Sequence, residues 1–286
     1  MSERDGLLVS TDWLADNLSL PDLVILDGSL FLPNEGRDPH KEYRHTHIPG
    51  ALFFDIEDLS DETSDLPHML PSPVKFSSRM RKMGIGDGKR IVAYDSKGMF
   101  SAARVWWMFR VMGHKDIAVL DGGLPKWVAE KRPVTDEIQA TQERHFTARR
   151  NAALVRDVDD IKAIVSGPNA DGIQIIDARA AERFAGTAPE PRPGLRAGHM
   201  PGARNIPYGS LLNADLTMKS TADLRKIFAD AGIDLGKPAV TSCGSGVTAA
   251  VISLALELVG HRDHALYDGS WVEWGGNEDH PVATGT

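Results

Sequence analysis

The sequence predicts two domains of the same α/β fold joined by a short polar linker, and three observations support this class. The chain has 286 residues, more than a single domain usually contains. Four short motifs recur in the same order, about 150 residues apart. In both halves, apolar runs of strand length alternate with segments of helical spacing, which is typical of parallel sheets covered by helices.

The recurring motifs define the two copies. VILDGS at 24–29 matches IIDARA at 175–180, HTHIPGAL at 45–52 matches AGHMPGAR at 197–204, VAYDSKGMFSAA at 92–103 matches VTSCGSGVTAAV at 240–251, and VLDGGLPKW at 119–127 matches LYDGSWVEW at 266–274. Four matches in one order indicate a duplicated domain. We predict that the copies span 7–135 and 151–280, and that the polar segment 136–150 is the linker.

Each copy carries its own set of buried strands and helices. The expected strands are LVILD at 23–27, RIVAYD at 90–95 and IAVLD at 117–121, then IQIID at 173–177, PAVTSC at 238–243 and HALYD at 264–268. Such continuous apolar runs favour parallel strands buried on both faces. Helices are expected at 74–84 and 222–232, where helical spacing ends in glycine. Each domain should therefore be a mostly parallel sheet flanked by helices.

The composition excludes several classes of function. A net charge of −8 argues against nucleic acid or an anionic membrane as the main partner. No apolar window is long enough to span a bilayer. A single cysteine excludes an internal disulfide framework and a zinc site with several thiolates. The close histidine pairs at 45/47 and 261/264 have no evident third ligand, so no metal site is predicted. Together these features predict a cytoplasmic protein.

The only cysteine, Cys243, lies where a predicted strand turns into an apolar helical segment. Ligands bind at this carboxyl edge of parallel sheets. Glycines in the loop allow successive amides to converge on one point, where they favour the nucleophilic thiolate form of a cysteine. The amides expected to do so belong to Gly244, Ser245, Gly246, Val247 and Thr248. The alternative is a buried structural cysteine. The counterpart Asp95 has no thiol, so the first copy is expected to be catalytically silent.

The loop CGSGVT at 243–248 resembles the active loop of the 3-mercaptopyruvate sulfurtransferases, within the rhodanese superfamily. HMLP at 68–71, RFAGTAPEPRPG at 183–194 and DGSWVEW at 268–274 extend the resemblance over essentially the whole chain. The resemblance implies two tandem rhodanese-like domains, with the catalytic cysteine in the second. It also implies that the sulfur of 3-mercaptopyruvate passes through a persulfide on Cys243 to a thiol, thioredoxin or cyanide, with release of pyruvate and without a cofactor.

Two arginines are candidates for binding the donor. Because Gly244 and Ser245 leave the loop uncharged, the loop suits a donor whose carboxylate lies some distance from its sulfur. An arginine fork can bind such a carboxylate. The resemblance implies that Arg183 and Arg192 do so. The alternative is a solvated loop in which they form surface ion pairs with Glu182 or Glu190.

A proton relay is also implied by the resemblance. Ser245 and His68 match the serine and histidine proposed for such a relay. Its acidic position falls on Glu57, where the family pattern has aspartate, and Asp55 and Asp61 are nearby alternatives. A histidine from the first copy can reach the loop only if the site lies where the domains meet. The other interpretation of His68 is a structural role in the HMLP turn.

Three rival functions are distinguishable from the sequence. A thiosulfate sulfurtransferase of this family would carry a more basic loop, with arginine and lysine after the cysteine. A cysteine phosphatase needs an arginine in a Cys-x5-Arg pattern, and Ala249 stands at that position. A sulfur carrier or docking protein would bind partners without turning over small donors.

Overall fold

The computed structural model describes residues 6–167 and 172–285. The chain forms two compact units. Unit 1 consists of the described residues up to Glu62 together with Leu70–Asn151 and Asn213–Met218. Unit 2 consists of Thr63–Met69, Ala152–Leu212 and the described residues from Lys219 onward. Each unit therefore contains a short segment from the other half of the sequence.

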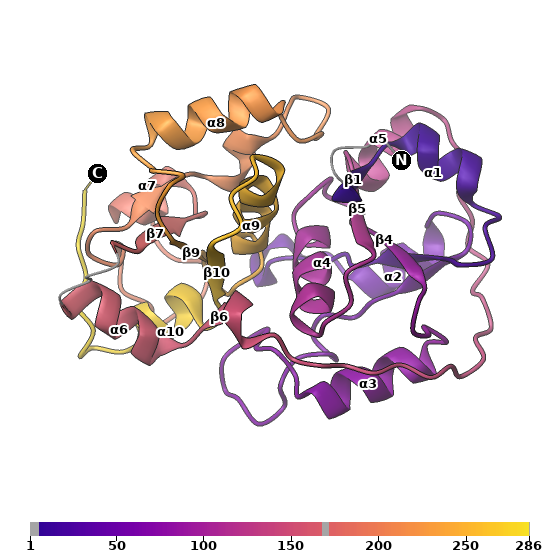
Figure 1. Ribbon diagram of the computed structural model, residues 1–286, viewed down its shortest axis with the longest axis horizontal. Coiled ribbons are helices and arrows are strands. Elements are labelled where there is room, and N and C mark those ends of the chain that lie inside the picture. The colour runs from indigo at the N-terminus through magenta and orange to yellow at the C-terminus, as the bar shows by residue number, and fades with distance from the viewer. Residues whose placement is uncertain (1–5, 168–171, 286) are drawn as a thin grey trace. The chain divides into compact units, whose positions relative to one another are not determined.

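Unit 1 is an α/β domain built around one parallel sheet (Figure 1). Its elements are β1 (Leu8–Val9), α1 (Thr11–Asn17), β2 (Leu23–Asp27), the 3-10 helix η2 (Pro33–Glu35), α2 (Pro39–His45), β3 (Ala51–Phe53), α3 (Pro73–Lys82), β4 (Arg90–Tyr94), α4 (Ala102–Val111), β5 (Ile117–Leu120) and α5 (Gly123–Ala129). The strand order is β1-β5-β4-β2-β3, with every pair parallel. Strand residues such as Ile25 and Val92 pack with Trp127 of α5 in the core.

Unit 2 repeats this architecture. Its elements are η3 (Ala152–Leu154), β6 (Val155–Arg156), α6 (Val158–Ser166), β7 (Gln174–Asp177), α7 (Ala181–Ala185), β8 (Arg204–Asn205), η4 (Tyr208–Leu211), α8 (Thr221–Asp230), β9 (Ala239–Ser242), α9 (Ala249–Leu258), β10 (His264–Tyr267) and α10 (Ser270–Gly276). The strand order β6-β10-β9-β7-β8 is the counterpart of that in unit 1, and all its pairs are parallel. Val240 packs in the core with Trp271 and Trp274.

The predicted fold class is confirmed, and the predicted strands and helices are found close to their expected positions. β2 covers the expected run 23–27, and β9 lies within 238–243. The two predicted helices correspond to α3 and α8, which begin just after the caps Ser72 and Ser220. Each serine side chain accepts a hydrogen bond from an amide in the first turn, which satisfies a donor that the helix itself leaves unpaired.

The segment 136–150, expected to be a linker, contains no helix or strand but packs as part of unit 1. Phe146 is buried against Phe76 and Phe109, with ring centroids 5.8 and 6.1 Å away. The Ala148 amide donates to the Ser77 hydroxyl. These contacts fix the segment along unit 1, because burial of an aromatic ring contributes on the order of 2 kcal/mol.

Candidate active site

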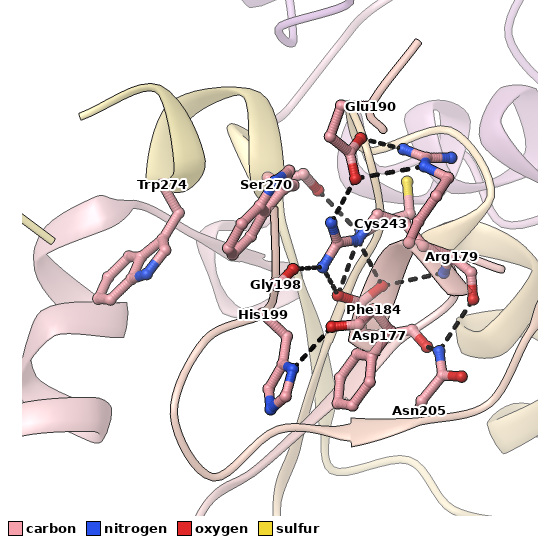
Figure 2. A network of polar contacts seen from close by, with 12 residues as sticks. Asp177, Arg179, Phe184, Glu190, Gly198, His199, Asn205, Cys243, Ser270 and Trp274 are labelled. Atoms are coloured by element: carbon pink, nitrogen blue, oxygen red, sulfur yellow. Dashed lines mark hydrogen bonds and ion pairs between the residues drawn. The ribbon is translucent and has the colours of Figure 1, made fainter. Parts of the chain in front are cut away.

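The loop 243–248 connects β9 to α9 at the carboxyl edge of the unit 2 sheet. β9 ends at Ser242, and α9 begins at Ala249 and is buried along its whole length. Gly246 has a φ of +76°, a left-handed conformation that residues with a side chain rarely adopt. Cys243 is 2% exposed. In Figure 2 its sulfur points to the side on which the Glu190 carboxylate lies. The cysteine is thus buried, but beside a polar network.

Ser270, the first residue of α10, braces this loop. Its hydroxyl oxygen accepts from the amides of Cys243 and Gly246 at 3.2 and 3.1 Å, and its hydroxyl donates to the Tyr267 carbonyl at 2.9 Å. The next two amides of α10 donate to the carbonyls of Cys243 and Gly244. Ser270 has a φ of +49°, which is strained for a residue with a side chain. The loop is therefore held from one side by four hydrogen bonds to the Ser270–Val272 segment.

The remaining loop amides are the candidates for holding an anion. We expected all the amides from Gly244 to Thr248 to contribute, but the Gly246 amide donates to Ser270. Within residues 6–167 and 172–285, no group accepts a hydrogen bond from the amides of Ser245, Val247 or Thr248. All three residues are buried. Buried amides are nearly always paired in folded proteins, so an unpaired set at a loop centre is suited to binding an anion.

The corresponding loop of unit 1 already contains an anionic group. Gly98, the counterpart of Gly246, also has a positive φ. The Asp95 carboxylate accepts from the amides of Lys97, Ser101 and Ala102, each at 2.8 Å. Burial raises the pKa of Asp95 above its ordinary value, and these amide bonds oppose that rise. In unit 1, backbone amides therefore bind the carboxylate that stands at the position of the Cys243 thiol.

The two units differ at the residue that packs against this loop at the start of α5 or α10. Gly123 of unit 1 corresponds to Ser270 of unit 2, and both have positive φ. A Cβ at Gly123 would lie 2.7 Å from the carbonyl oxygens of Asp95 and Gly98, which is too close for any side chain. Unit 2 accommodates a serine there and uses its hydroxyl to bind loop amides. The loop around Cys243 is therefore more open at this point than its duplicate.

His68 and Ser245, both predicted for the site, are in direct contact. The His68 Nδ1 atom lies 2.9 Å from the Ser245 hydroxyl oxygen, and both side chains are buried. His68 belongs to the Thr63–Met69 segment, which is part of unit 2. It also has a φ of +63°, an uncommon conformation that often accompanies functional constraint. This hydrogen bond allows a proton to pass between the imidazole and the hydroxyl.

The acidic member of the relay stays a prediction. Glu57, Asp55 and Asp61 belong to unit 1, whereas His68 belongs to unit 2. The Asp55 carboxylate lies 2.9 Å from the His40 Nε2 atom, within unit 1. It also accepts from the Glu57 amide.

Arg183 lies on α7 with its guanidinium beside the loop. A Cβ added to Gly244 would lie 3.2 Å from the Arg183 Nη2 atom. Arg183 forms an ion pair with Glu190, Nη2 to Oε2, at 2.5 Å. The ion pair with Glu190, part of the alternative interpretation, is therefore present, but it is not an exposed one. The observed pair is largely buried, since the Glu190 side chain is 2% and the Arg183 side chain 21% exposed. Arg192 is half-buried on the same connection, and its part in binding stays a prediction.

A buried network that sequence reasoning missed continues from Glu190 (Figure 2). The Arg179 Nη1 atom lies 2.7 Å from Glu190 Oε1, and its Nη2 atom lies 2.7 Å from Asp177 Oδ2. Burial alone would lower the pKa of Arg179, but Asp177 and Glu190 raise it above its ordinary value. One signal was available: when Asp27 is aligned with Asp177, Ser29 stands in the first copy at the position of Arg179. Ser270 in place of Gly123 was a second such departure.

The described part of the chain can be searched for metal sites and for membrane-spanning helices. It has no group of three or more His, Cys, Asp or Glu side chains that could hold a metal ion. Likewise, none of its helices is both long and apolar enough to cross a bilayer.

Comparison with known proteins matches both halves of the chain to one family model. The model of the rhodanese-like domain matches residues 10–130 and 157–277. The chain is 44% identical over 275 residues to the "3-mercaptopyruvate sulfurtransferase" of Escherichia coli (strain K12), covering 96% of both chains. It is 43% identical over 296 residues to the "Thiosulfate/3-mercaptopyruvate sulfurtransferase 1, mitochondrial" of Arabidopsis thaliana, covering 96% of this chain and 77% of the relative.

A solved structure gives the same result. The crystal structure of SseA from Escherichia coli, described under the "Rhodanese" fold and catalytic mechanism of 3-mercaptopyruvate sulfotransferases, superposes with a TM-score of 0.84. The two chains are 41% identical, and the match covers 92% of this chain and 98% of the other.

Proposed function

This chain belongs to the rhodanese family, and from that premise we propose that it is a 3-mercaptopyruvate sulfurtransferase with Cys243 as its nucleophile. The donor is 3-mercaptopyruvate, the intermediate is a persulfide on Cys243, and the acceptor is a thiol, such as that of thioredoxin, or cyanide. Unit 1 is catalytically silent in this proposal, because its loop carries Asp95 where unit 2 carries the thiol.

The reaction has two half-reactions. The Cys243 thiolate attacks the donor sulfur, a sulfur–sulfur bond forms, and the carbon–sulfur bond of the donor breaks. Its electron pair stays on carbon as the enolate of pyruvate, which takes up a proton. An acceptor thiolate then attacks the outer sulfur of the persulfide, and Cys243 leaves as a thiolate ready for another cycle.

The amide cradle around Cys243 is the observation that carries this proposal. The amides of Ser245, Val247 and Thr248 are unpaired in the described chain. In unit 1 the amide of Lys97, the counterpart of Ser245, donates to the Asp95 carboxylate, which stands at the position of Cys243. Amides that are already oriented toward a developing negative charge stabilise it without further reorganisation. In unit 2 that charge would be the thiolate before the first half-reaction and the persulfide anion after it.

Arg183 is proposed to bind the donor carboxylate. Its guanidinium lies beside Gly244, next to the nucleophile, and two nitrogens of one edge are paired with Glu190. A charge-assisted hydrogen bond is worth about 1.5–3 kcal/mol, so loss of one should lower the rate constant for the donor about tenfold to a hundredfold. Arg192 is proposed as a second cation for the keto acid.

Ser245 and His68 are proposed to supply the proton that the enolate needs. The Ser245 hydroxyl lies in the loop next to the nucleophile and is hydrogen-bonded to His68 Nδ1 at 2.9 Å. A hydroxyl in contact with an imidazole can give up its proton and be reprotonated from the ring.

Mass spectrometry of the intact protein after treatment with 3-mercaptopyruvate, without acceptor, tests the proposal. We expect a gain of one sulfur atom, located on the peptide that contains Cys243, and its loss after addition of cyanide. Cys243→Ser is the control and should gain no sulfur. Donor turnover that persists in Cys243→Ser would exclude Cys243 as the nucleophile.

The alternative is a thiosulfate sulfurtransferase. It is favoured by the name of the Arabidopsis relative, which includes both donors. It is opposed by the uncharged residues Gly244 and Ser245, because a small dianion needs cations close to the cysteine. Comparing kcat/KM for the two donors decides between them, and a preference for thiosulfate would reverse the assignment. A cytoplasmic location is proposed from the composition and the single cysteine alone.

A further inference from the structure

Glu190 occupies one edge of the Arg183 guanidinium and leaves the rest of it available. The Arg183 Nε and Nη2 atoms donate to Glu190 Oε1 and Oε2 at 3.3 and 2.5 Å. Among the described residues, Nη1 has no hydrogen-bond partner. A guanidinium carries five donors in a planar fork, so a carboxylate on one edge still leaves Nη1 and one Nη2 hydrogen for a second carboxylate.

Glu190 is itself held in place. Its Oε1 atom accepts from Arg179 Nη1 at 2.7 Å. Arg179 is fixed in turn by Asp177, by the Gly198 carbonyl at 2.8 Å, and by the Trp271 ring, whose centroid lies 4.2 Å from its Cζ atom. The side chains of Asp177 and Arg179 are fully buried. A fully packed and paired side chain has one rotamer, so Arg179 gives Glu190 a fixed anchor.

The backbone around Glu190 is restricted as well. Pro189 precedes it and Pro191 follows it. Proline fixes its own φ and restricts the residue before it to extended conformations. Little conformational entropy is therefore left to lose when the Glu190 carboxylate pairs with both arginines.

The silent unit provides an internal comparison. Ser29 and Arg179 have the same backbone environment, since each amide donates to an aspartate Oδ1 at 2.9 Å, from Asp27 and Asp177 respectively. Only the unit that contains the cysteine has an arginine at this position. The ion network is therefore not needed to build the fold, and it accompanies the nucleophile.

We propose that Glu190 is a positioning residue that holds the Arg183 guanidinium at the Cys243 loop with its Nη1 end free for the donor carboxylate, and that Arg179 anchors Glu190. This inference rests on the proposed function. Glu190 acts through Arg183 and does not contact the donor. The negative charge of Glu190 opposes the attraction of Arg183 for an anionic donor. Glu190 therefore contributes through the position that it gives the guanidinium.

Glu190→Gln distinguishes geometry from charge. Glutamine has a single acceptor oxygen, and its amide nitrogen cannot accept from an arginine. If position matters, kcat/KM for 3-mercaptopyruvate falls about tenfold, as expected for one misplaced charge-assisted contact. Since each kcat/KM of a ping-pong enzyme reports its own half-reaction, kcat/KM for cyanide stays unchanged. If only charge matters, removing the carboxylate makes the site more positive and kcat/KM for the donor rises, which would overturn the proposal.

Two further variants complete the test. Glu182→Gln is the matched control, because Glu182 is exposed on α7, the helix that carries Arg183. This variant should behave as the wild type. In an Arg183→Ala background, Glu190→Gln should change the donor kcat/KM less than about twofold, since coupled residues are not additive. A full tenfold loss in that background would show that Glu190 acts by another route.

Two further measurements distinguish a folding defect and a failure of the proposed function from a failure of the positioning role. If Glu190→Gln does not fold, Glu190→Asp retains the charge but shortens the reach, and should lower the donor kcat/KM several-fold with an unchanged value for cyanide. Wild-type donor kinetics in Glu190→Asp would contradict the proposal. A wild-type protein that does not turn over 3-mercaptopyruvate would refute the proposed function itself.

Discussion

Replacing Ser270 should separate the two contributions of this residue, backbone strain and loop hydrogen bonds. Its hydroxyl accepts from two buried amides, those of Cys243 and Gly246. Leaving a buried donor unsatisfied costs about 1–3 kcal/mol, so leaving both donors unsatisfied in Ser270→Ala should lower the free energy of unfolding by about 2–6 kcal/mol. Ser270→Gly loses the same bonds but relieves a left-handed conformation that costs roughly 1–2 kcal/mol. The glycine variant should therefore be the more stable of the two.

Hydrogen exchange detected by mass spectrometry measures this effect locally. The amides of Cys243 and Gly246 should exchange faster in both variants, and kcat/KM for 3-mercaptopyruvate should fall at least about tenfold because the nucleophile loop loses its brace. Ser253→Ala is the matched control, since the Ser253 hydroxyl makes one buried bond, to Thr241. Unchanged loop exchange in Ser270→Ala, with a stability loss no larger than that of Ser253→Ala, would refute the reasoning.

Two other substitutions test the anion cradle and the buried carboxylates of unit 1. Cys243→Asp should abolish turnover but be about 1–3 kcal/mol more stable than Cys243→Ala, because a carboxylate there can bind amides as Asp95 does; equal stability of the two variants in urea unfolding would contradict an anion site. Burial raises the pKa of Asp27 to about 6, so the folded chain binds this proton more tightly than the unfolded chain and loses stability as the pH rises from about 4 to about 6. Asp27→Asn removes the ionisation and should be about 1–3 kcal/mol more stable than the wild type at pH 7, with little difference at pH 4. Urea unfolding at both pH values checks this, and a constant difference would show that Asp27 does not titrate as stated.

The elements that the sequence predicted are those with local signals. A continuous apolar run identified β2, and helical spacing after Ser72 identified α3. The cysteine loop was predictable because glycines next to Cys243, between a strand and a helix, have few structural alternatives. The contact of His68 with Ser245 was expected from the resemblance and is present at 2.9 Å.

What escaped prediction depends on contacts between residues distant in sequence. Nothing local to Arg179 indicates that it will meet Glu190 in a buried ion pair, since a charged residue near a strand end is usually solvated. The role of Ser270 similarly depends on its approach to Cys243, which the fold determines. In both cases the informative signal was a difference between the two copies. The second copy has Arg179 and Ser270 where the first has the smaller residues Ser29 and Gly123.

The Thr63–Met69 segment has a consequence for how the duplicated chain can be dissected. A fragment that starts at residue 152 would keep the thiol but lose the imidazole that contacts Ser245. The half without a nucleophile thus supplies a part that the other half lacks. Under the proposed proton relay, the second half of the chain alone would lack one member of the relay, so both halves would be needed for the proposed activity.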